Sequence, residues 1–212
     1  MCPCLTEELE RKFYGTEPVF VWDEQNDTNR PVRGVHVNEI KFWPIYPKFV
    51  RETFQEAFSN AAMVGADTQH RVTEKKWQEV FTALRDCLAI CTCGGETFID
   101  VKESSCKCIN CGKDIQRPLL MKVKKYNVVM QPQKKIYACH AVHDSDDFRE
   151  VKGEIITSRQ DPSLIGLKND SDNSWTAILP NGATKVYTNG QVIKLGRGLK
   201  INFGNGNEAE II

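Results

Sequence analysis

Two cysteine-containing turns carry the clearest chemical signal in the sequence. The first contains Cys91 and Cys93 and runs into a pair of glycines, and the second contains Cys108 and Cys111 and runs into Gly112. Glycine after a tight turn lets backbone amides point toward sulfur, which is how zinc knuckles are built. Four thiolates at about 2.3 Å satisfy tetrahedral Zn²⁺ and leave no open position. The sequence therefore predicts a structural zinc site with these four cysteines as ligands.

Cys106 competes for a place in this ligand set. It forms a Cys-x-Cys pair with Cys108, whereas the first turn is itself one residue shorter than the usual Cys-x-x-Cys knuckle. The spacing alone thus leaves open whether Cys106 replaces Cys91 or Cys93. Cys87 precedes the first turn on a predicted helix, and we expect it to be a buried free thiol.

A second metal site at Cys139, His140 and His143 is the weaker interpretation of those residues. A histidine pair without further ligands rarely binds a metal in a closed site. We expect His140 to be a partly buried strand residue, and His143 to lie in the acidic loop of residues 144–147.

Composition indicates an ordinary soluble protein that buries a core. Of its 212 residues, 41% are hydrophobic and 26% are charged, with 28 basic and 28 acidic side chains. Such a balanced chain has no global field that would draw it to a polyanion. We therefore expect neither nucleic acid nor a membrane as a partner.

The cysteine count fits a reducing compartment. No stretch approaches the roughly 18 apolar residues of a membrane helix, and the N-terminus does not resemble a signal peptide. We expect a cytoplasmic protein, in which nine cysteines are more often free or metal-bound than paired in disulfides. Cys2 and Cys4 are predicted to be disordered.

A basic run beside the second turn is compatible with a nucleic-acid-binding role. A solvated strand face explains this run better, because no aromatic side chains are interleaved with it. The run consists of Lys113, Arg117, Lys122, Lys124 and Lys125.

The pattern changes along the chain from helices to strands. Thr6 and Thr73 are natural N-caps, a helix is predicted after Pro47, and residues 19–22 read as extended. The helices after Pro47 and Thr73 each have one apolar stripe, and we expect the two stripes to pack together.

The C-terminal part alternates like short strands separated by Gly and Asn turns, which predicts a β-sandwich. The predicted strands are residues 119–123, 127–130, 135–138, 153–156, 175–178, 184–187, 191–195 and 199–203. The expected fold class is α+β, with a helical region at 1–90, a zinc ribbon at 91–116 and a sandwich at 117–212.

Several motifs in the helical region resemble one family. They are residues 14–23 (YGTEPVFVWD), 29–31 (NRP), 43–47 (WPIYP) and 70–77 (HRVTEKKW). Together they resemble the end of the C-lobe of bacterial serine/threonine kinases of the tellurite-resistance phosphorylation triad. In kinases an Arg at this point pairs with a buried Glu near the activation segment, and Arg71 matches that position. The resemblance implies a von Willebrand-type domain protein and a PP2C-type phosphatase as partners.

The same family continues with a Cys-rich ribbon and a β domain that contains a Gly-Leu-Lys-Asn stretch, found here at residues 166–169. The chain has no glycine-rich phosphate loop, His-Arg-Asp catalytic loop or Asp-Phe-Gly motif. It therefore resembles the C-terminal portion of such a kinase and is not expected to be an enzyme by itself.

The β domain resembles a forkhead-associated sandwich, through residues 188–195 and 198–204. That family reads phosphothreonine with an Arg in an early Gly-Arg turn, but the corresponding segment, 134–140, has no Arg. Arg197 lies too late in the chain, and Arg159 is the other candidate.

The interpretation that follows is a non-catalytic regulatory and protein-interaction module of a bacterial kinase signalling system, with a structural zinc. The alternatives are a fragment that completes an active kinase, and a domain that binds phosphothreonine peptides.

Overall fold

The computed structural model describes residues 6–64, 71–100, 106–204 and 207–212. The chain divides into two compact units, residues 1–84 and 85–212. Helices dominate the first unit and antiparallel strands the second, so the fold class is α+β as predicted. The predicted domain boundaries near residues 90 and 116 stay a prediction. Cys2 and Cys4 lie outside the described residues.

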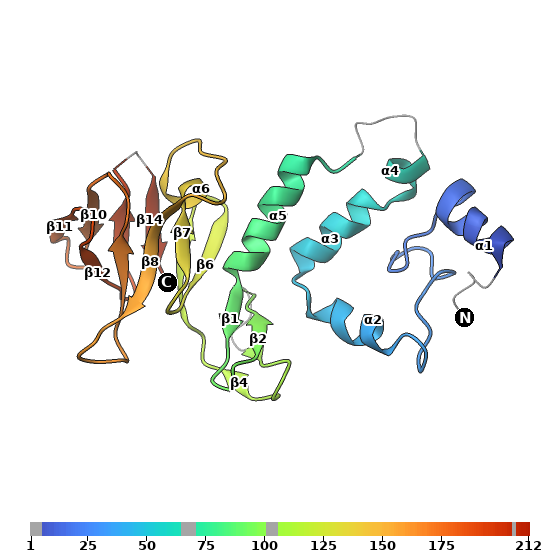
Figure 1. Ribbon diagram of the computed structural model, residues 1–212, viewed down its shortest axis with the longest axis horizontal. Helices are drawn as coiled ribbons and strands as arrows, with labels where there is room; N and C mark the ends of the chain where they lie inside the picture. Colours follow the sequence, from blue (N-terminus) through green and yellow to red (C-terminus); the bar gives the residue numbers. More distant parts are fainter. Residues whose placement is uncertain (1–5, 65–70, 101–105, 205–206) are drawn as a thin grey trace. The chain divides into compact units, whose positions relative to one another are not determined.

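The first unit is built from short helices. The N-cap predictions are confirmed, because the Thr6 hydroxyl accepts from the Leu9 amide at 3.3 Å and Thr73 from the Lys76 amide at 3.2 Å. The helices of this unit are α1 (Glu7–Arg11), η1 (Lys12–Thr16), α2 (Val37–Phe42), η2 (Trp43–Ile45), α3 (Lys48–Ala57), α4 (Asn60–Val64) and α5 (Glu74–Asp86), which ends in the second unit (Figure 1).

The two apolar stripes pack as expected, through aromatic rings. The rings of Phe54 on α3 and Trp77 on α5 meet edge to face with centroids 5.0 Å apart. Residues 19–22 do not form the predicted extended run. Instead the chain turns there, with the Asp23 amide bonded to the Phe20 carbonyl, and the Phe20 ring stacks on Phe58. Ring packing against α3 thus overrides the local β propensity of this segment.

The second unit contains two larger antiparallel sheets. Their strand orders are β11-β10-β13-β14-β5-β6 and β12-β9-β8-β7 (Figure 1). The strands are β5 (Leu119–Val123), β6 (Tyr126–Met130), β7 (Lys135–Tyr137), β8 (Val151–Thr157), β9 (Ile165–Asn169), β10 (Trp175–Ile178), β11 (Thr184–Tyr187), β12 (Val192–Lys194), β13 (Lys200–Asn202) and β14 (Glu208–Ile211).

The two sheets pack on each other around Trp175. This side chain of β10 is fully buried, and a Cβ at Gly153 on β8 would lie only 2.7 Å from its ring. Glycine is therefore required where the indole crosses the opposite sheet. All eight predicted strands are confirmed within a few residues, whereas β9 and β14 were missed.

The predicted turns are confirmed by their backbone angles. Gly182, Gly190, Gly198 and Gly204 all have φ between +78° and +86°. At Gly204 a Cβ would also lie 2.8 Å from the Ser174 carbonyl oxygen, so this turn is tight as well as left-handed.

Two small hairpins precede the sheets, and we call them the knuckle hairpins. The first pairs β1 (Leu88–Ile90) with β2 (Glu96–Phe98), and the second pairs β3 (Cys106–Lys107) with β4 (Asp114–Ile115). Ala89 and Ile99 of the first share a buried cluster with Leu120 and Val129 of the larger sheet. The knuckle hairpins are therefore packed on the sheet and share its core.

His140 differs from its predicted place. It lies in the short helix α6 (Ala138–Ala141) and not in a strand, and it is fully buried rather than partly buried. The strand β7 ends early because the His140 ring accepts a hydrogen bond from the Tyr137 amide, which begins the helical turn. His143 is exposed beside Asp144, as expected.

Candidate metal centre

Each knuckle hairpin presents its cysteines on a turn closed by its own backbone. In the first, the Cys91 amide donates to the Gly95 carbonyl at 2.8 Å, and Gly94 follows with φ of +80°. In the second, the Cys108 amide donates to the Lys113 carbonyl at 2.9 Å. The two turns are alike, although one holds a Cys-x-Cys pair and the other a Cys-x-x-Cys pair.

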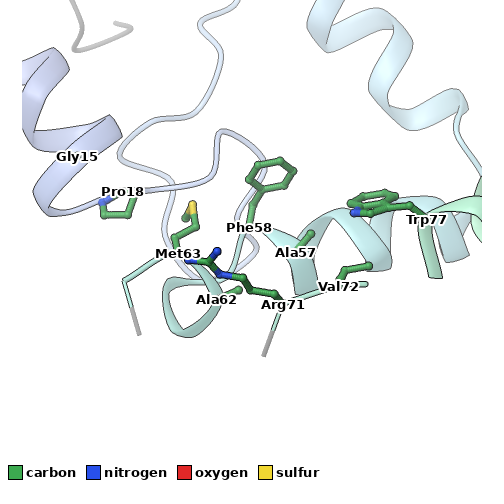
Figure 2. A pocket seen from close by; sticks show the side chains of 9 residues that line it. All are labelled: Gly15, Pro18, Ala57, Phe58, Ala62, Met63, Arg71, Val72 and Trp77. Atoms are coloured by element: carbon green, nitrogen blue, oxygen red, sulfur yellow. The ribbon is translucent and has the colours of Figure 1, made fainter. Parts of the chain in front are cut away.

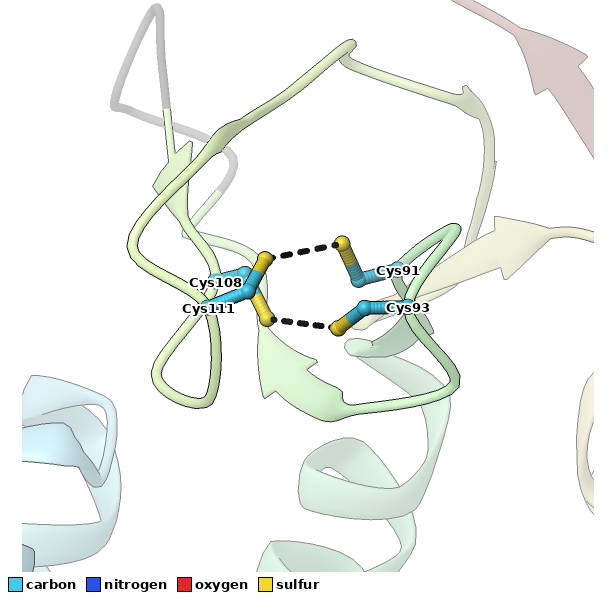
Figure 3. Close-up of side chains that lie close together, drawn as sticks. All are labelled: Cys91, Cys93, Cys108 and Cys111. Carbon is cyan, nitrogen blue, oxygen red and sulfur yellow. Dashed lines mark hydrogen bonds between the residues drawn. The ribbon is translucent and has the colours of Figure 1, made fainter.

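The four thiols of the two turns converge. Their sulfurs all lie within 4.8 Å of one another, and the Sγ atoms are 3.8 Å apart for Cys91 and Cys111 and 3.6 Å apart for Cys93 and Cys108 (Figure 3). A tetrahedral ion with metal–sulfur bonds of about 2.3 Å requires sulfurs about 3.8 Å apart. The cluster therefore has the dimensions of a four-thiolate metal site.

Gly95 makes room for the cluster. A Cβ at this position would lie 2.8 Å from the Cβ of Asn110 and 3.3 Å from the sulfurs of both Cys93 and Cys108. Its φ is not in the left-handed region, so space and not backbone conformation demands glycine here. The Gly95 amide also points at the Cys93 sulfur, at 3.4 Å.

Hydrogen bonds polarise the four thiols unequally. The Gly95 amide, together with the neighbouring thiols, lowers the pKa of Cys93 to about 6. The pKa of Cys91 is lowered too, chiefly by the Cys93 amide. Although the Lys113 amide acts the other way, the hydrogen bond with Cys93 and burial raise the pKa of Cys111 to about 11. Two thiols of the cluster, Cys91 and Cys93, are thus more acidic than an ordinary cysteine, which favours their thiolate forms as ligands of a cation.

The other described cysteines lie outside this cluster. Cys106 donates to the Phe98 carbonyl at 3.3 Å and packs against the buried cluster of Ala89 and Leu120. Cys87 is buried as predicted, and desolvation followed by the charge of Asp86 raises its pKa to about 12. All seven described cysteines are free thiols: Cys87, Cys91, Cys93, Cys106, Cys108, Cys111 and Cys139.

A buried polar pair escaped the sequence analysis. The Nε2 atom of His140 lies 2.9 Å from the Asp86 carboxylate, and the two side chains are 0% and 3% exposed. Since the His140 Nδ1 accepts from the Tyr137 amide, Nε2 is the nitrogen that donates to Asp86. The pair joins the end of α5 to α6. No local motif marks it, because its members are 54 residues apart.

Arg71 lines a pocket of the first unit. The pocket has a volume of about 450 Å³, and Arg71 is its one charged lining residue among the described parts of the chain. Figure 2 shows its guanidinium extending toward Met63 and Ala62, with Phe58 and Trp77 farther along the wall. This is an open hollow of mixed polar and apolar surface, with Arg71 as its charged group.

The candidate phosphate-binding residues are not assembled into a site. Arg159 and Arg197 are exposed in turns. The loops before β8 and after β9 are acidic instead, and they contain Asp144, Asp146, Asp147, Glu150, Asp170 and Asp172. Such loops repel a phosphate group.

The basic run beside the second cysteine turn does not form one continuous basic surface, because Lys124 makes internal hydrogen bonds while Lys122 is exposed on a strand. Lys124 donates to the carbonyls of Cys139 and Val142, so it is an internal brace. Lys122 is exposed on β5 and faces Glu210 of β14. This arrangement favours a structural and solvated role for the run.

Comparisons with known proteins gave no relative: no protein-family model, no curated protein and no solved structure matches the chain. Among the described residues, no helix has the length and apolarity needed to cross a membrane.

Proposed function

We propose that this chain is a non-catalytic protein-interaction module whose knuckle hairpins are closed by one structural Zn²⁺. The observation that carries the proposal is the convergence of four thiols at 3.6 and 3.8 Å across the two turns. Four sulfurs in tetrahedral reach suit zinc among the common cellular ions, since soft thiolates select it and hard carboxylate ligands do not take part.

A closed four-sulfur shell supports a structural role for the ion. The four cysteines would occupy all positions of a tetrahedral ion, which leaves none for a water or a substrate. When bound, zinc would hold the two turns together and supply no reaction step. Zinc binding would therefore also stabilise the larger sheet, because the knuckle hairpins share the buried cluster of Leu120 and Val129 with it.

Metal analysis tests the zinc directly. Protein purified without chelators should contain about one zinc per chain by mass spectrometry, and a chelator should lower its melting temperature. Cys111→Ser should lower both the zinc content and the melting temperature. Cys106→Ser, outside the cluster, should leave the zinc content unchanged. A chain with no zinc and no response to chelation contradicts the proposal.

We further propose that the module serves a bacterial serine/threonine kinase system in the cytoplasm, beside a von Willebrand-type domain protein and a PP2C-type phosphatase. The support is the resemblance of its motifs, together with two packed antiparallel sheets as in a forkhead-associated sandwich. The acidic loops before β8 and after β9 would repel a phosphate group, which weighs against phosphothreonine as the ligand.

Peptide-binding measurements distinguish phosphorylated from unphosphorylated protein ligands. In calorimetry, phosphothreonine peptides should bind no more tightly than their unphosphorylated forms. A clear preference for the phosphorylated forms that Arg159→Ala or Arg197→Ala abolishes would replace this proposal with phosphopeptide recognition.

A second candidate function is the completion of a kinase C-lobe by the first unit. Exposed apolar surface in this unit favours it, because Phe58, Phe81 and Val64 are 40% to 52% exposed and Phe58 also lines the Arg71 pocket. The test is the natural reading frame. A longer polypeptide that contains the three kinase motifs and transfers phosphate from ATP supports it, and a frame without them opposes it.

A further inference from the structure

The four sulfurs form two pairs across the turns, and each pair joins an exposed cysteine to a buried one. The exposed Cys93 lies 3.6 Å from Cys108, which is 2% exposed, and the exposed Cys111 lies 3.8 Å from Cys91, which is 7% exposed. A small oxidant in solution can therefore reach one sulfur of each pair. The sulfur beside it is shielded and comes from the opposite turn.

We propose that the metal centre is a peroxide-sensitive switch, in which oxidation releases the metal and forms the disulfides Cys93–Cys108 and Cys91–Cys111. This inference rests on the proposed function, because it takes Zn²⁺ as the ion held by the four cysteines.

The chemistry needs only a peroxide as co-reactant. The Cys93 sulfur attacks one oxygen of hydrogen peroxide, an S–O bond forms, the O–O bond breaks, and hydroxide leaves and takes up a proton as water. The Cys108 sulfur then attacks the Cys93 sulfur, an S–S bond forms, the S–O bond breaks, and hydroxide leaves and takes up a proton from solvent as a second water. Cys111 and Cys91 react in the same way. Each pair of thiolates gives two electrons to one peroxide as its disulfide forms, and Zn²⁺ is released when its thiolates are consumed.

The backbone around the turns favours pairing across them. A disulfide needs sulfurs about 2.05 Å apart, so each pair must close by about 1.5 to 2 Å. Within the first turn, the hydrogen bonds from Cys91 to Gly95 and from Gly94 to Cys91 fix a conformation in which Cys91 is buried and Cys93 is exposed. A bond between those two cysteines would have to break this turn.

The hairpins should stay packed after the metal leaves. The side-chain amide of Gln131 pairs with both backbone groups of Ile90, at 2.8 and 3.1 Å. Ala89 and Ile99 remain in the buried cluster, which contains no ligand of the metal. Two disulfides across the turns would replace the cross-link that zinc supplied. Oxidation should therefore lower the melting temperature less than chelation does.

A peptide map tests the pairing. Trypsin cleaves this sequence so that Cys91 and Cys93 fall in peptide 86–102, and Cys108 and Cys111 in peptide 108–113. Zinc-loaded protein would be treated with hydrogen peroxide, while a coloured zinc chelator reports release. We expect one zinc to be released per two peroxides consumed, and the two peptides to be joined by two disulfides. A thiol reductant with added zinc should restore the metal and separate the peptides.

Variants assign the individual bonds. Cys93→Ser should retain only the bond from Cys91 to Cys111, and Cys106→Ser should behave like the wild type. Should Cys93→Ser fail to fold, fragmentation of the joined wild-type peptides locates the same bonds.

The outcomes separate this inference from the metal centre itself. A chain that binds no zinc before oxidation overturns the proposed function and the switch with it. A chain that binds zinc but keeps it under peroxide, or yields peptides bridged only within each turn, overturns the switch and leaves the structural zinc standing.

Discussion

Gly95→Ala tests the geometry of the metal centre with a single methyl group. The added Cβ would lie 2.8 Å from the Asn110 Cβ and 3.3 Å from the sulfurs of Cys93 and Cys108. Carbon atoms in contact lie about 3.5 to 4.0 Å apart, so the two turns must separate by about 0.7 Å or more. The clash involves atoms close to the backbone, which cannot rotate away.

The size of the effect follows from the overpacking. Extra methyl groups in a well-packed site typically cost about 1–3 kcal/mol. If most of this strain appears only when the turns close on the ion, zinc affinity should fall by about 5- to 150-fold. Competition between the protein and a coloured zinc chelator measures this change, and thermal unfolding with and without a chelator gives the part that depends on metal.

Two further variants act as controls. Gly196→Ala also lies outside the left-handed region, and nothing lies within 4 Å of its Cβ, so it should leave zinc affinity unchanged. Gly95→Ala combined with Asn110→Gly removes the closest contact and should recover part of the affinity. Wild-type affinity in Gly95→Ala, or an equal loss of stability with and without metal, would refute the reasoning.

Three other predictions concern the second unit. Folding raises the pKa of Cys87 from its ordinary value of 9.0 to about 12. The contribution of this thiol to the free energy of unfolding is therefore complete below pH 9 and is lost as the pH rises toward 12. Cys87→Ala should therefore reduce the alkaline fall in the free energy of unfolding, by up to about 1.4 kcal/mol per pH unit, in denaturant titrations at pH 9 to 11; an unchanged slope would contradict the burial of this thiol. His140→Ala removes the partner at 2.9 Å from the buried Asp86 carboxylate, which keeps only the Arg85 guanidinium at 3.4 Å, and should cost about 1.5–3 kcal/mol in chemical unfolding; a loss below about 1 kcal/mol would show the pair to be dispensable. Gly153→Ala puts a methyl group 2.7 Å from the Trp175 ring and should cost about 1–3 kcal/mol or more, with a change in tryptophan fluorescence; a neutral result would mean that the sheets are farther apart than described.

Local chemistry in the sequence was enough to predict the caps, the turns and most strands. Thr6 and Thr73 cap their helices because a side-chain oxygen three residues before an amide needs no other part of the fold. The Gly turns at 182 and 190 follow equally from backbone conformation. Strands 119–123, 175–178 and 184–187 match β5, β10 and β11 in full, since short apolar or β-branched runs between Pro, Gly and Asn turns mark strands.

The sequence did not predict β9 and β14. β9 contains glycine and lysine beside its buried residues, and β14 alternates Glu with Ala and Ile over four residues only. Both are strands because their neighbours supply hydrogen bonds, as β8 and β12 do for β9. Pairing with partners distant in sequence decides such segments, and periodicity within them does not.

For the metal centre, the sequence by itself determined the two knuckle turns, because each is made by residues within a few positions of one another. It left open whether Cys106 belongs to the ligand set, since any of these thiols can be brought near by a loop of unknown path. The tertiary structure places Cys106 outside the cluster of four sulfurs, because its thiol turns toward Phe98, and places Cys91 beside Cys111. It also decided the partnership of Asp86 with His140 and the need for glycine at 95. Contacts of this kind depend on how separate elements pack together, and the spacing of residues along the chain does not encode that distance.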